Sequence, residues 1–232
     1  MNTNISTMNQ HQNLHQFDYQ IPTPVTPILG RKKQVEELSE LLQQHRILTI
    51  TGAGGIGKTR ISLEICNAIQ QEFQDGIFFV SMATLNDAKE VIPTLADSLG
   101  VTEVGGRDLA EGVSSVLSDK KVLLTLDNLE HVISASYEIS NLIAQCPNLS
   151  VLCTSRTPLK IRAEYEYALP PLALPSDTTF DKLLDYPAIE LFVKCAQKVN
   201  RDFELSEENA HEITEICRRI DGLPLALELA AA

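Results

Sequence analysis

The stretch of sequence that decides the fold is Gly52-Ala53-Gly54-Gly55-Ile56-Gly57-Lys58-Thr59. Its spacing fits the pattern G-x-x-x-x-G-K-[ST] of a phosphate-binding loop. Glycines let the backbone adopt positive φ angles and approach phosphate oxygens, and successive N–H groups at the start of a helix then bind the anion. Lys58 supplies a mobile positive charge, and the hydroxyl of Thr59 can bind Mg²⁺. The stretch therefore predicts a site for the phosphates of a nucleotide, ATP or ADP.

A glycine-rich turn followed by a chance Lys-Thr pair is the alternative interpretation. The flanking residues argue against it, because a β-rich run, residues 47–51, precedes the loop and a helical pattern, residues 59–73, follows it. In this part of the chain the residues expected to contact the nucleotide are Gly52, Gly54, Gly55, Ile56, Gly57, Lys58, Thr59 and Arg60.

Apolar runs alternate with helical patterns throughout the middle of the chain. The predicted strands are residues 47–51, 77–80, 122–126, 151–154 and 165–169, and the predicted helices are residues 31–44, 59–73, 88–99, 109–117 and 129–146. Continuous apolar strands separated by helices are typical of a parallel sheet that helices cover on both faces. The sequence therefore predicts an α/β fold of the P-loop NTPase type, with three layers built on a parallel sheet.

The domain organisation follows from shifts in composition. Residues 1–27 hold four Asn and four Gln, and we interpret them as a disordered tail. Residues 28–186 are the predicted P-loop nucleotide-binding domain. Residues 187–232 contain only helical patterns and are the predicted helical subdomain.

Within the helical subdomain, the sequence predicts helices at residues 188–199 and 206–220 and from Pro224 onward. Ser206 is the expected N-cap of the second helix, Gly222 its C-terminal stop, and Pro224 the first residue of the third. The third pattern runs to Ala232 without a stop signal, so we expect this small subdomain to be truncated.

Composition excludes several classes of function. With 19 basic and 31 acidic residues the net charge is −12, which repels phosphate backbones, so we expect no direct nucleic-acid binding by this chain. No run of about 18 apolar residues predicts a membrane span, and no secretory signal opens the chain. The five cysteines are odd in number and lack C-x-x-C spacing, which predicts free structural thiols and a cytoplasmic location.

Asp127 directly follows the apolar run 122–126, which is the usual place of the second acidic motif of P-loop proteins. Its carboxylate is expected to act with Thr59 in holding Mg²⁺, although an Asp that merely starts the next helix is the alternative. Asn128 stands where fast ATPases carry Glu. Because an amide cannot accept a proton as a general base, we expect slow hydrolysis, with Asn128 as a helix N-cap. Glu130 is the nearest remaining carboxylate and a candidate for contacting the attacking water, and a solvated helix start is the alternative.

The order of these motifs resembles the STAND class, the signal-transduction ATPases with numerous domains. The resemblance is strongest to the NB-ARC-like ATPase domains of large bacterial regulators of the LuxR-like and antibiotic-regulator types. The matching stretches are residues 28–31, 48–60, 124–132 (LTLDNLEHV), 151–159 (VLCTSRTPL), 169–175 (LPPLALP) and 215–231 (EICRRIDGLPLALELAA). The P-loop alone is shared by many families, whereas these motifs in this order are far more specific.

The resemblance implies roles for three further residues. Arg156 matches the arginine that senses the γ-phosphate, and its alternative is a surface ion pair. Pro224 matches the residue that packs on the adenine or ribose side of the nucleotide. Arg31 matches the N-terminal motif that lines the base pocket, but Lys32 and Lys33 follow it where the family usually carries Glu.

The implied function is an ATP/ADP-binding signalling switch with slow ATP hydrolysis. Lys58, Asp127, Arg156 and Glu130 are the candidate catalytic residues, Thr59 and Asp127 the candidate Mg²⁺ ligands. The resemblance also implies protein partners or self-association in the ATP state. Two alternatives stay open. One is an interaction module without significant catalysis, and the other is a small-molecule kinase, for which residues 158–187 offer few lid cations, among them Lys160 and Arg162.

Overall fold

The computed structural model describes residues 21–24, 26–102 and 108–232. The predicted tail, residues 1–27, lies outside the described residues except for 21–24 and 26–27. Within the described part, no helix combines the length and the apolar character needed to cross a bilayer.

Five parallel strands form one sheet in the spatial order β2-β3-β4-β1-β5. The strands are β1 (Ile47–Thr51), β2 (Ile77–Ser81), β3 (Leu123–Asp127), β4 (Ser150–Ser155) and β5 (Glu164–Ala168). All five strands agree with the predicted runs to within two residues at each end. Because β4 pairs with β3 on one side and β1 on the other, the loops after these three strands leave the same edge of the sheet side by side.

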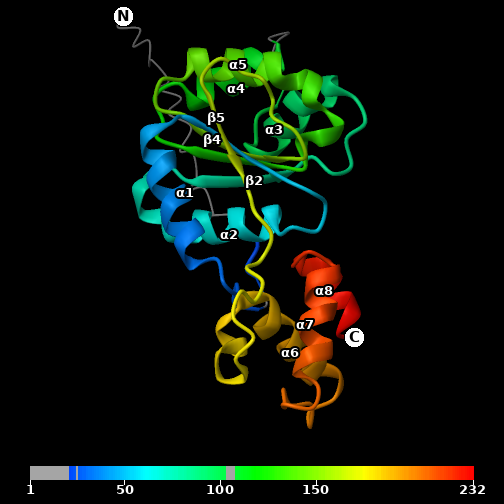
Figure 1. Ribbon diagram of the computed structural model, residues 1–232. Helices are drawn as coiled ribbons and strands as arrows, with labels where there is room; N and C mark the ends of the chain where they lie inside the picture. The colour runs from blue at the N-terminus through cyan, green and yellow to red at the C-terminus, as the bar shows by residue number, and fades with distance from the viewer. Residues whose placement is uncertain (1–20, 25, 103–107) are drawn as a thin grey trace, which may run out of the picture.

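Helices cover both faces of this sheet, which confirms the predicted three-layer α/β fold (Figure 1). Successive residues of a strand point to opposite faces, and β1 follows this rule, because Ile47 packs in one hydrophobic cluster and Leu48 in the other. The helices α1 (Lys32–Gln44) and α2 (Lys58–Ala68) pack on one face. The helices α3 (Val91–Ser98), α4 (Leu109–Leu117) and α5 (Ser136–Gln145) pack on the other. Burial on both faces explains why β1 to β4 are largely apolar runs. The edge strand β5 instead alternates Glu and Tyr and stays partly exposed.

The predicted helix at residues 129–146 is partly wrong. The chain instead makes two short 3₁₀ helices, Leu129–His131 and Ile133–Ala135, before α5 begins. Leu129, Val132 and Ala135 are each almost fully buried. This spacing of three matches the three residues per turn of a 3₁₀ helix, so the segment buries one stripe by winding more tightly than an α-helix.

The helices after residue 186 pack around a third hydrophobic cluster, on the side of the P-loop domain where α2 begins (Figure 1). They are α6 (Pro187–Val199), α7 (Ala210–Arg219) and α8 (Pro224–Ala230), preceded by a 3₁₀ helix at Phe180–Asp185. Pro224 is the first residue of α8, as predicted. The division of the chain at residues 28–186 and 187–232 stays a prediction.

The start of α7 differs from the prediction. The helix begins at Ala210 and Ser206 is not its N-cap. The side chain of Asn209 instead accepts a hydrogen bond from the backbone N–H of Ser206, at 2.9 Å, and closes a turn before the helix. The predicted stop is confirmed: Gly222 has φ +64° and its N–H donates to the carbonyl oxygen of Cys217 at 3.1 Å.

Candidate functional site

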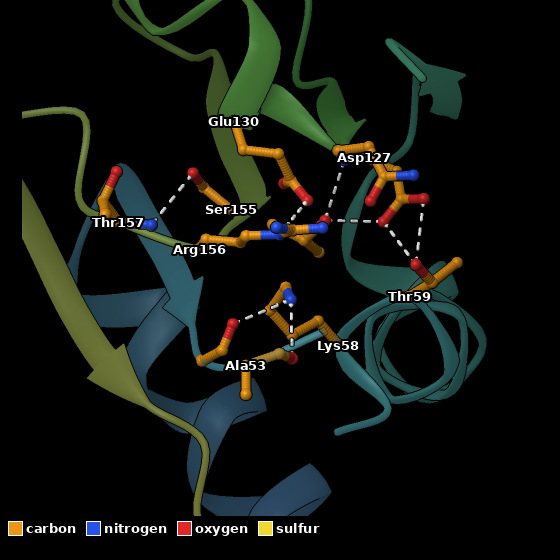
Figure 2. A network of polar contacts seen from close by, with 11 residues as sticks. Ala53, Lys58, Thr59, Asp127, Glu130, Ser155, Arg156 and Thr157 are labelled. Atoms are coloured by element: carbon orange, nitrogen blue, oxygen red, sulfur yellow. Dashed lines mark hydrogen bonds and ion pairs between the residues drawn. The ribbon is translucent and has the colours of Figure 1, made fainter. Parts of the chain in front are cut away.

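The predicted phosphate-binding loop connects the buried strand β1 to the first turn of α2. Gly55 and Gly57 have φ angles of +75° and +97°, which side-chain-bearing residues rarely adopt. The ammonium group of Lys58 donates to the carbonyl oxygens of Gly52 and Ala53, at 2.9 and 3.1 Å. The lysine is therefore held against the loop by two bonds within its own motif, as Figure 2 shows.

Three charged groups from two other segments, the end of β3 with the turn after it and the loop after β4, act on Lys58. Burial lowers the pKa of its ammonium group, the carboxylate of Glu130 raises this pKa, Arg156 lowers it and Asp127 raises it. Because such interactions require proximity, the three other predicted catalytic residues lie within electrostatic reach of Lys58. The sequence could not establish this proximity, because nearly 100 residues separate Lys58 from Arg156.

The two predicted Mg²⁺ ligands are in direct contact. The hydroxyl of Thr59 donates to Asp127, with distances of 2.8 and 3.0 Å to the two carboxylate oxygens. Asp127 is the last residue of β3 and is only 3% exposed. A hydroxyl and a carboxylate are oxygen donors of the kind Mg²⁺ prefers. The pair therefore fits a magnesium ion that a nucleotide brings.

Thr154 is a site residue that the sequence analysis missed. Its fully buried hydroxyl donates to Oδ1 of Asp127 at 2.6 Å and accepts the backbone N–H of Asn128 at 3.0 Å. In the sheet, Leu126 lies beside Cys153, so Thr154 comes next to Asp127. A polar residue near the end of an apolar strand is a sequence feature that could have indicated a site residue. Its partner, Asp127, could be identified only once β3 was known to pair with β4.

Asn128 occupies the predicted N-cap position, before the 3₁₀ helix Leu129–His131, but does not cap it through its side chain. It has φ +64°, a left-handed conformation that Asn tolerates, and its side chain makes no capping hydrogen bond. Two residues further on, Glu130 lines the same cavity as the phosphate-binding loop.

Glu130 and Arg156 form an ion pair beside the loop, with 3.3 Å between Oε1 and Nε. The side chain of Glu130 is 12% exposed, so its alternative interpretation as a solvated helix start is wrong. Its second oxygen, Oε2, is buried without a hydrogen-bond partner among the described residues. The guanidinium of Arg156 lies over the loop, because a Cβ built on Gly54 would be 3.8 Å from Nη2. Both interpretations of Arg156, near the phosphates and in an ion pair, are thus compatible with its position.

The loop opens into a cavity of about 650 Å³ between the P-loop domain and the helices after residue 186. This volume is in the usual range for small-molecule sites. The predicted residues that line it are Arg31, Gly54, Gly55, Ile56, Gly57, Lys58, Thr59, Arg60, Glu130, Arg156 and Pro224. Gly52 and Asp127 do not line it; they lie behind Lys58 and Thr59, to which they are hydrogen-bonded.

The opposite end of the cavity is built from the N-terminal segment and α2. Arg31 is 4% exposed and donates from Nη2 to the carbonyl oxygen of Ile56 at 3.3 Å, while its Nη1 is buried without a partner among the described residues. Burial lowers the pKa of Arg31. Arg60 donates to the carbonyl oxygen of Thr26 and pairs with Glu64 at 2.7 Å. Arg60 therefore holds the N-terminal segment in place beside the cavity.

Two helices of the C-terminal part close the remaining side. The backbone N–H of Leu225, at the start of α8, donates to the carbonyl oxygen of Gly55 at 3.2 Å. A Cβ on Gly55 would lie 2.8 Å from Cβ of Leu225, so this helix and the loop pack closely. The sequence analysis did not assign the cavity residues Leu191, Lys194, Cys195, Lys198 and Glu228. Four of them follow the i, i+3, i+4, i+7 spacing of one face of α6.

The profile of the NB-ARC domain matches residues 31–159. The chain belongs to the NB-ARC family. This NB-ARC membership confirms the resemblance to STAND-class P-loop ATPases that the motifs indicated, and it makes the chain a nucleotide-binding module.

Curated relatives of this NB-ARC chain are longer proteins. The uncharacterized protein Rv0894 of Mycobacterium tuberculosis is 37% identical over 209 residues, which cover 90% of this chain and 51% of that protein. The regulatory protein AfsR of Streptomyces coelicolor is 24% identical, and the match covers 92% of this chain and 21% of AfsR. The chain therefore spans about half the length of the first relative and about a fifth of the second.

Among solved structures, the chain is similar to a STAND protein with a tetratricopeptide repeat sensor, PH0952 from Pyrococcus horikoshii. The TM-score is 0.56 at 15% identity, and the match covers 92% of this chain and 31% of that one. At this identity the similarity supports the P-loop ATPase fold alone.

Proposed function

We propose that this chain is an ATP/ADP-binding switch with slow ATP hydrolysis, and that it acts as the ATPase module of a regulatory protein. The observation that carries the proposal is the cavity of about 650 Å³ that the phosphate-binding loop, Thr59 and Arg156 line together, with Asp127 hydrogen-bonded to Thr59 directly behind it. The regulatory part of the proposal is supported by the relative named regulatory protein AfsR.

In the proposed complex, the phosphates replace the two carbonyl oxygens as partners of Lys58, and the N–H groups of the loop bind the remaining phosphate oxygens. Thr59 and Asp127 hold the Mg²⁺ that accompanies the nucleotide, and this ion would neutralise phosphate charge. Pro224 and Arg31 bound the base and ribose side of the cavity. Arg156 reaches the γ-phosphate and thereby distinguishes ATP from ADP, because only a differential contact can shift an equilibrium between two states.

The slow rate follows from the residues after β3. Asn128 cannot accept a proton, and Glu130, which we propose as the acceptor of the proton from the attacking water, is paired with Arg156. Turnover is expected well below about 10 per second, the median for enzymes. We further propose that the ATP-bound form self-associates or binds a protein partner, that the chain binds no nucleic acid directly, and that it works in the cytoplasm.

Two other functions are less well supported. Lys160 and Arg162, the cations expected of a kinase lid, do not line the cavity. An interaction module without catalysis is favoured only by Asn128 in place of Glu, and it predicts phosphate release that is the same for the wild type and for Asp127→Ala.

Calorimetric titration of ADP and ATP with Mg²⁺ tests the proposal. Saturable binding is expected for the wild type, and Lys58→Ala is expected to weaken it at least tenfold, about 1.4 kcal/mol, because a charge-assisted contact to phosphate is lost. Lys89→Ala, at a lysine that does not line the cavity, is the matched control and should bind as the wild type does. A correctly folded wild type that binds neither nucleotide would refute the proposal.

A further inference from the structure

The ion pair between Glu130 and Arg156 occupies the position where the proposed function needs a free arginine. Figure 2 shows the side chain of Arg156 extended between Glu130 on one side and Lys58 on the other. Both Glu130 and a γ-phosphate are oxyanions, and a guanidinium group binds either with the same N–H donors. The two anions are therefore competitors for one cation.

The two members of the pair differ in burial. The side chain of Glu130 is 12% exposed, whereas that of Arg156 is 63% exposed. Glu130 Oε2 is buried without a hydrogen-bond partner among the described residues, and Oε1 forms the ion pair with Arg156, so this pair stabilises a mostly buried carboxylate. A buried charge is costly when its partner is removed. Glu130 is thus the fixed member, and Arg156 is the member that can turn toward another anion.

We infer that Glu130 is a positioning residue that competes with the γ-phosphate for Arg156 and so lowers the preference of the site for a nucleoside triphosphate over a diphosphate. The inference rests on the proposed nucleotide-binding function and adds to it a residue that sets ligand preference. A diphosphate has no γ group and leaves the pair intact. A triphosphate gains Arg156 only by breaking or sharing the pair, and the cost of doing so is subtracted from its affinity.

The inference also links ligand preference to hydrolysis. While Arg156 holds Glu130, the carboxylate is a weaker acceptor for the proton of the attacking water. When Arg156 turns to the γ-phosphate, Glu130 becomes free to accept that proton, as the water oxygen bonds to the γ-phosphorus and the bond from this phosphorus to the leaving oxygen of ADP breaks. Loss of the Glu130 charge should therefore raise triphosphate preference and lower turnover, two effects of opposite sign.

The experiment is a double-mutant cycle on the full 232-residue chain. Two ligands are titrated by calorimetry in the presence of Mg²⁺: ADP, and the non-hydrolysable ATP analogue with a β,γ-imido bridge. Their affinities are measured for the wild type, Glu130→Gln, Arg156→Ala and the double variant. Glu130→Gln is expected to raise the ratio of analogue affinity to ADP affinity about two- to fivefold, the range for a partly exposed ion pair. Arg156→Ala should lower the ratio, and Glu130→Gln should not change it in the Arg156→Ala background.

Two further variants serve as controls. One tests whether the position of the Glu130 carboxylate matters as well as its charge, and the other tests the effect of breaking an ion pair elsewhere. Glu130→Asp keeps the charge but withdraws the carboxylate from Arg156, so the ratio of analogue affinity to ADP affinity should again rise. If Glu130→Gln fails to fold, Glu130→Asp takes its place in the cycle. Glu215→Gln breaks an ion pair of similar length on α7, 3.2 Å to Arg218, outside the cavity lining, and should leave the ratio unchanged.

The outcomes distinguish the inference from the function on which it rests. Equal changes in both affinities for Glu130→Gln would mean that Glu130 has only a structural role. A rise of the same size in the Arg156→Ala background would mean that Glu130 repels the phosphate directly, without acting through Arg156. Either result overturns the inference while nucleotide binding stands, whereas a wild type that binds neither ligand refutes the proposed function itself.

Discussion

Replacement of Thr154 by valine tests the part of the site that holds Asp127. The substitution keeps a similar shape but removes the hydroxyl that donates to Asp127 at 2.6 Å and accepts from the N–H of Asn128 at 3.0 Å. A hydrogen bond to a charged group contributes about 1.5–3 kcal/mol, and leaving a donor unpaired adds to the loss. We therefore expect Thr154→Val to lower the free energy of unfolding by about 2–4 kcal/mol. For a chain of this length the unfolding midpoint should fall by roughly 5–12 °C.

Thermal and urea unfolding measure this loss, and Thr125→Val is the matched control. Thr125 is equally buried in the neighbouring strand β3, but within the described part of the chain its hydroxyl hydrogen-bonds only to the thiol of Cys66, at 3.1 Å. Its replacement should therefore cost about 1 kcal/mol or less. In Thr154→Val, Thr59 is the one side-chain donor that the described residues still offer to the carboxylate of Asp127, and the Mg²⁺-dependent part of ADP affinity should fall. Equal stability losses for the two variants would show that the hydroxyl does not position Asp127, and the reasoning would be refuted.

Two further predictions concern parts of the chain away from the phosphates. Gly222→Ala should destabilise the helical part by about 3 kcal/mol or more, because the residue has φ +64° and a Cβ there would lie 2.4 Å from the carbonyl oxygen of Leu172. Hydrogen exchange measures this loss, and protection of α7 and α8 equal to that of the wild type would contradict the prediction. Burial raises the pKa of the Cys66 thiol to about 11. The native state therefore keeps a proton that the unfolded chain releases, so stability should be full below about pH 9 and fall by about 2–3 kcal/mol toward pH 11. The fall, followed by urea unfolding, should be shallower in Cys66→Ala, and an unchanged slope would show that this thiol does not cause it.

The strands were predictable because their physical signal is local. A strand that is buried on both faces is mostly apolar, and residues 47–51, 122–126 and 151–154 carry that pattern, with threonine as the one polar residue type among them. The loop glycines were predictable for a similar reason, since only glycine accepts φ angles such as the +97° of Gly57 at little cost. Features that depend on one segment alone can be inferred from that segment.

The helix pattern at residues 129–146 failed because two kinds of winding bury nearly the same residues. Leu129 and Val132 are three apart, a spacing that suits both an α-helix and a 3₁₀ helix. The left-handed turn at Asn128, with φ +64°, then sets where the segment starts over the sheet. Tertiary contacts with the sheet, which the segment's own sequence does not contain, decide between the two.

The residues that complete the site were missed because they depend on which strands are neighbours. The sequence predicts parallel strands, and hence that their carboxyl ends share one edge, but it does not predict that β4 lies between β3 and β1. That order brings Thr154 beside Asp127 and places Arg156 over Gly54. The same limit applies to Lys194 and Lys198 of α6, which the sequence analysis did not assign and which line the cavity beside the contact of α8 with Gly55. Motifs thus identified the groups that bind phosphate, while the strand order and the docking of the helical part determine which other charges those groups meet.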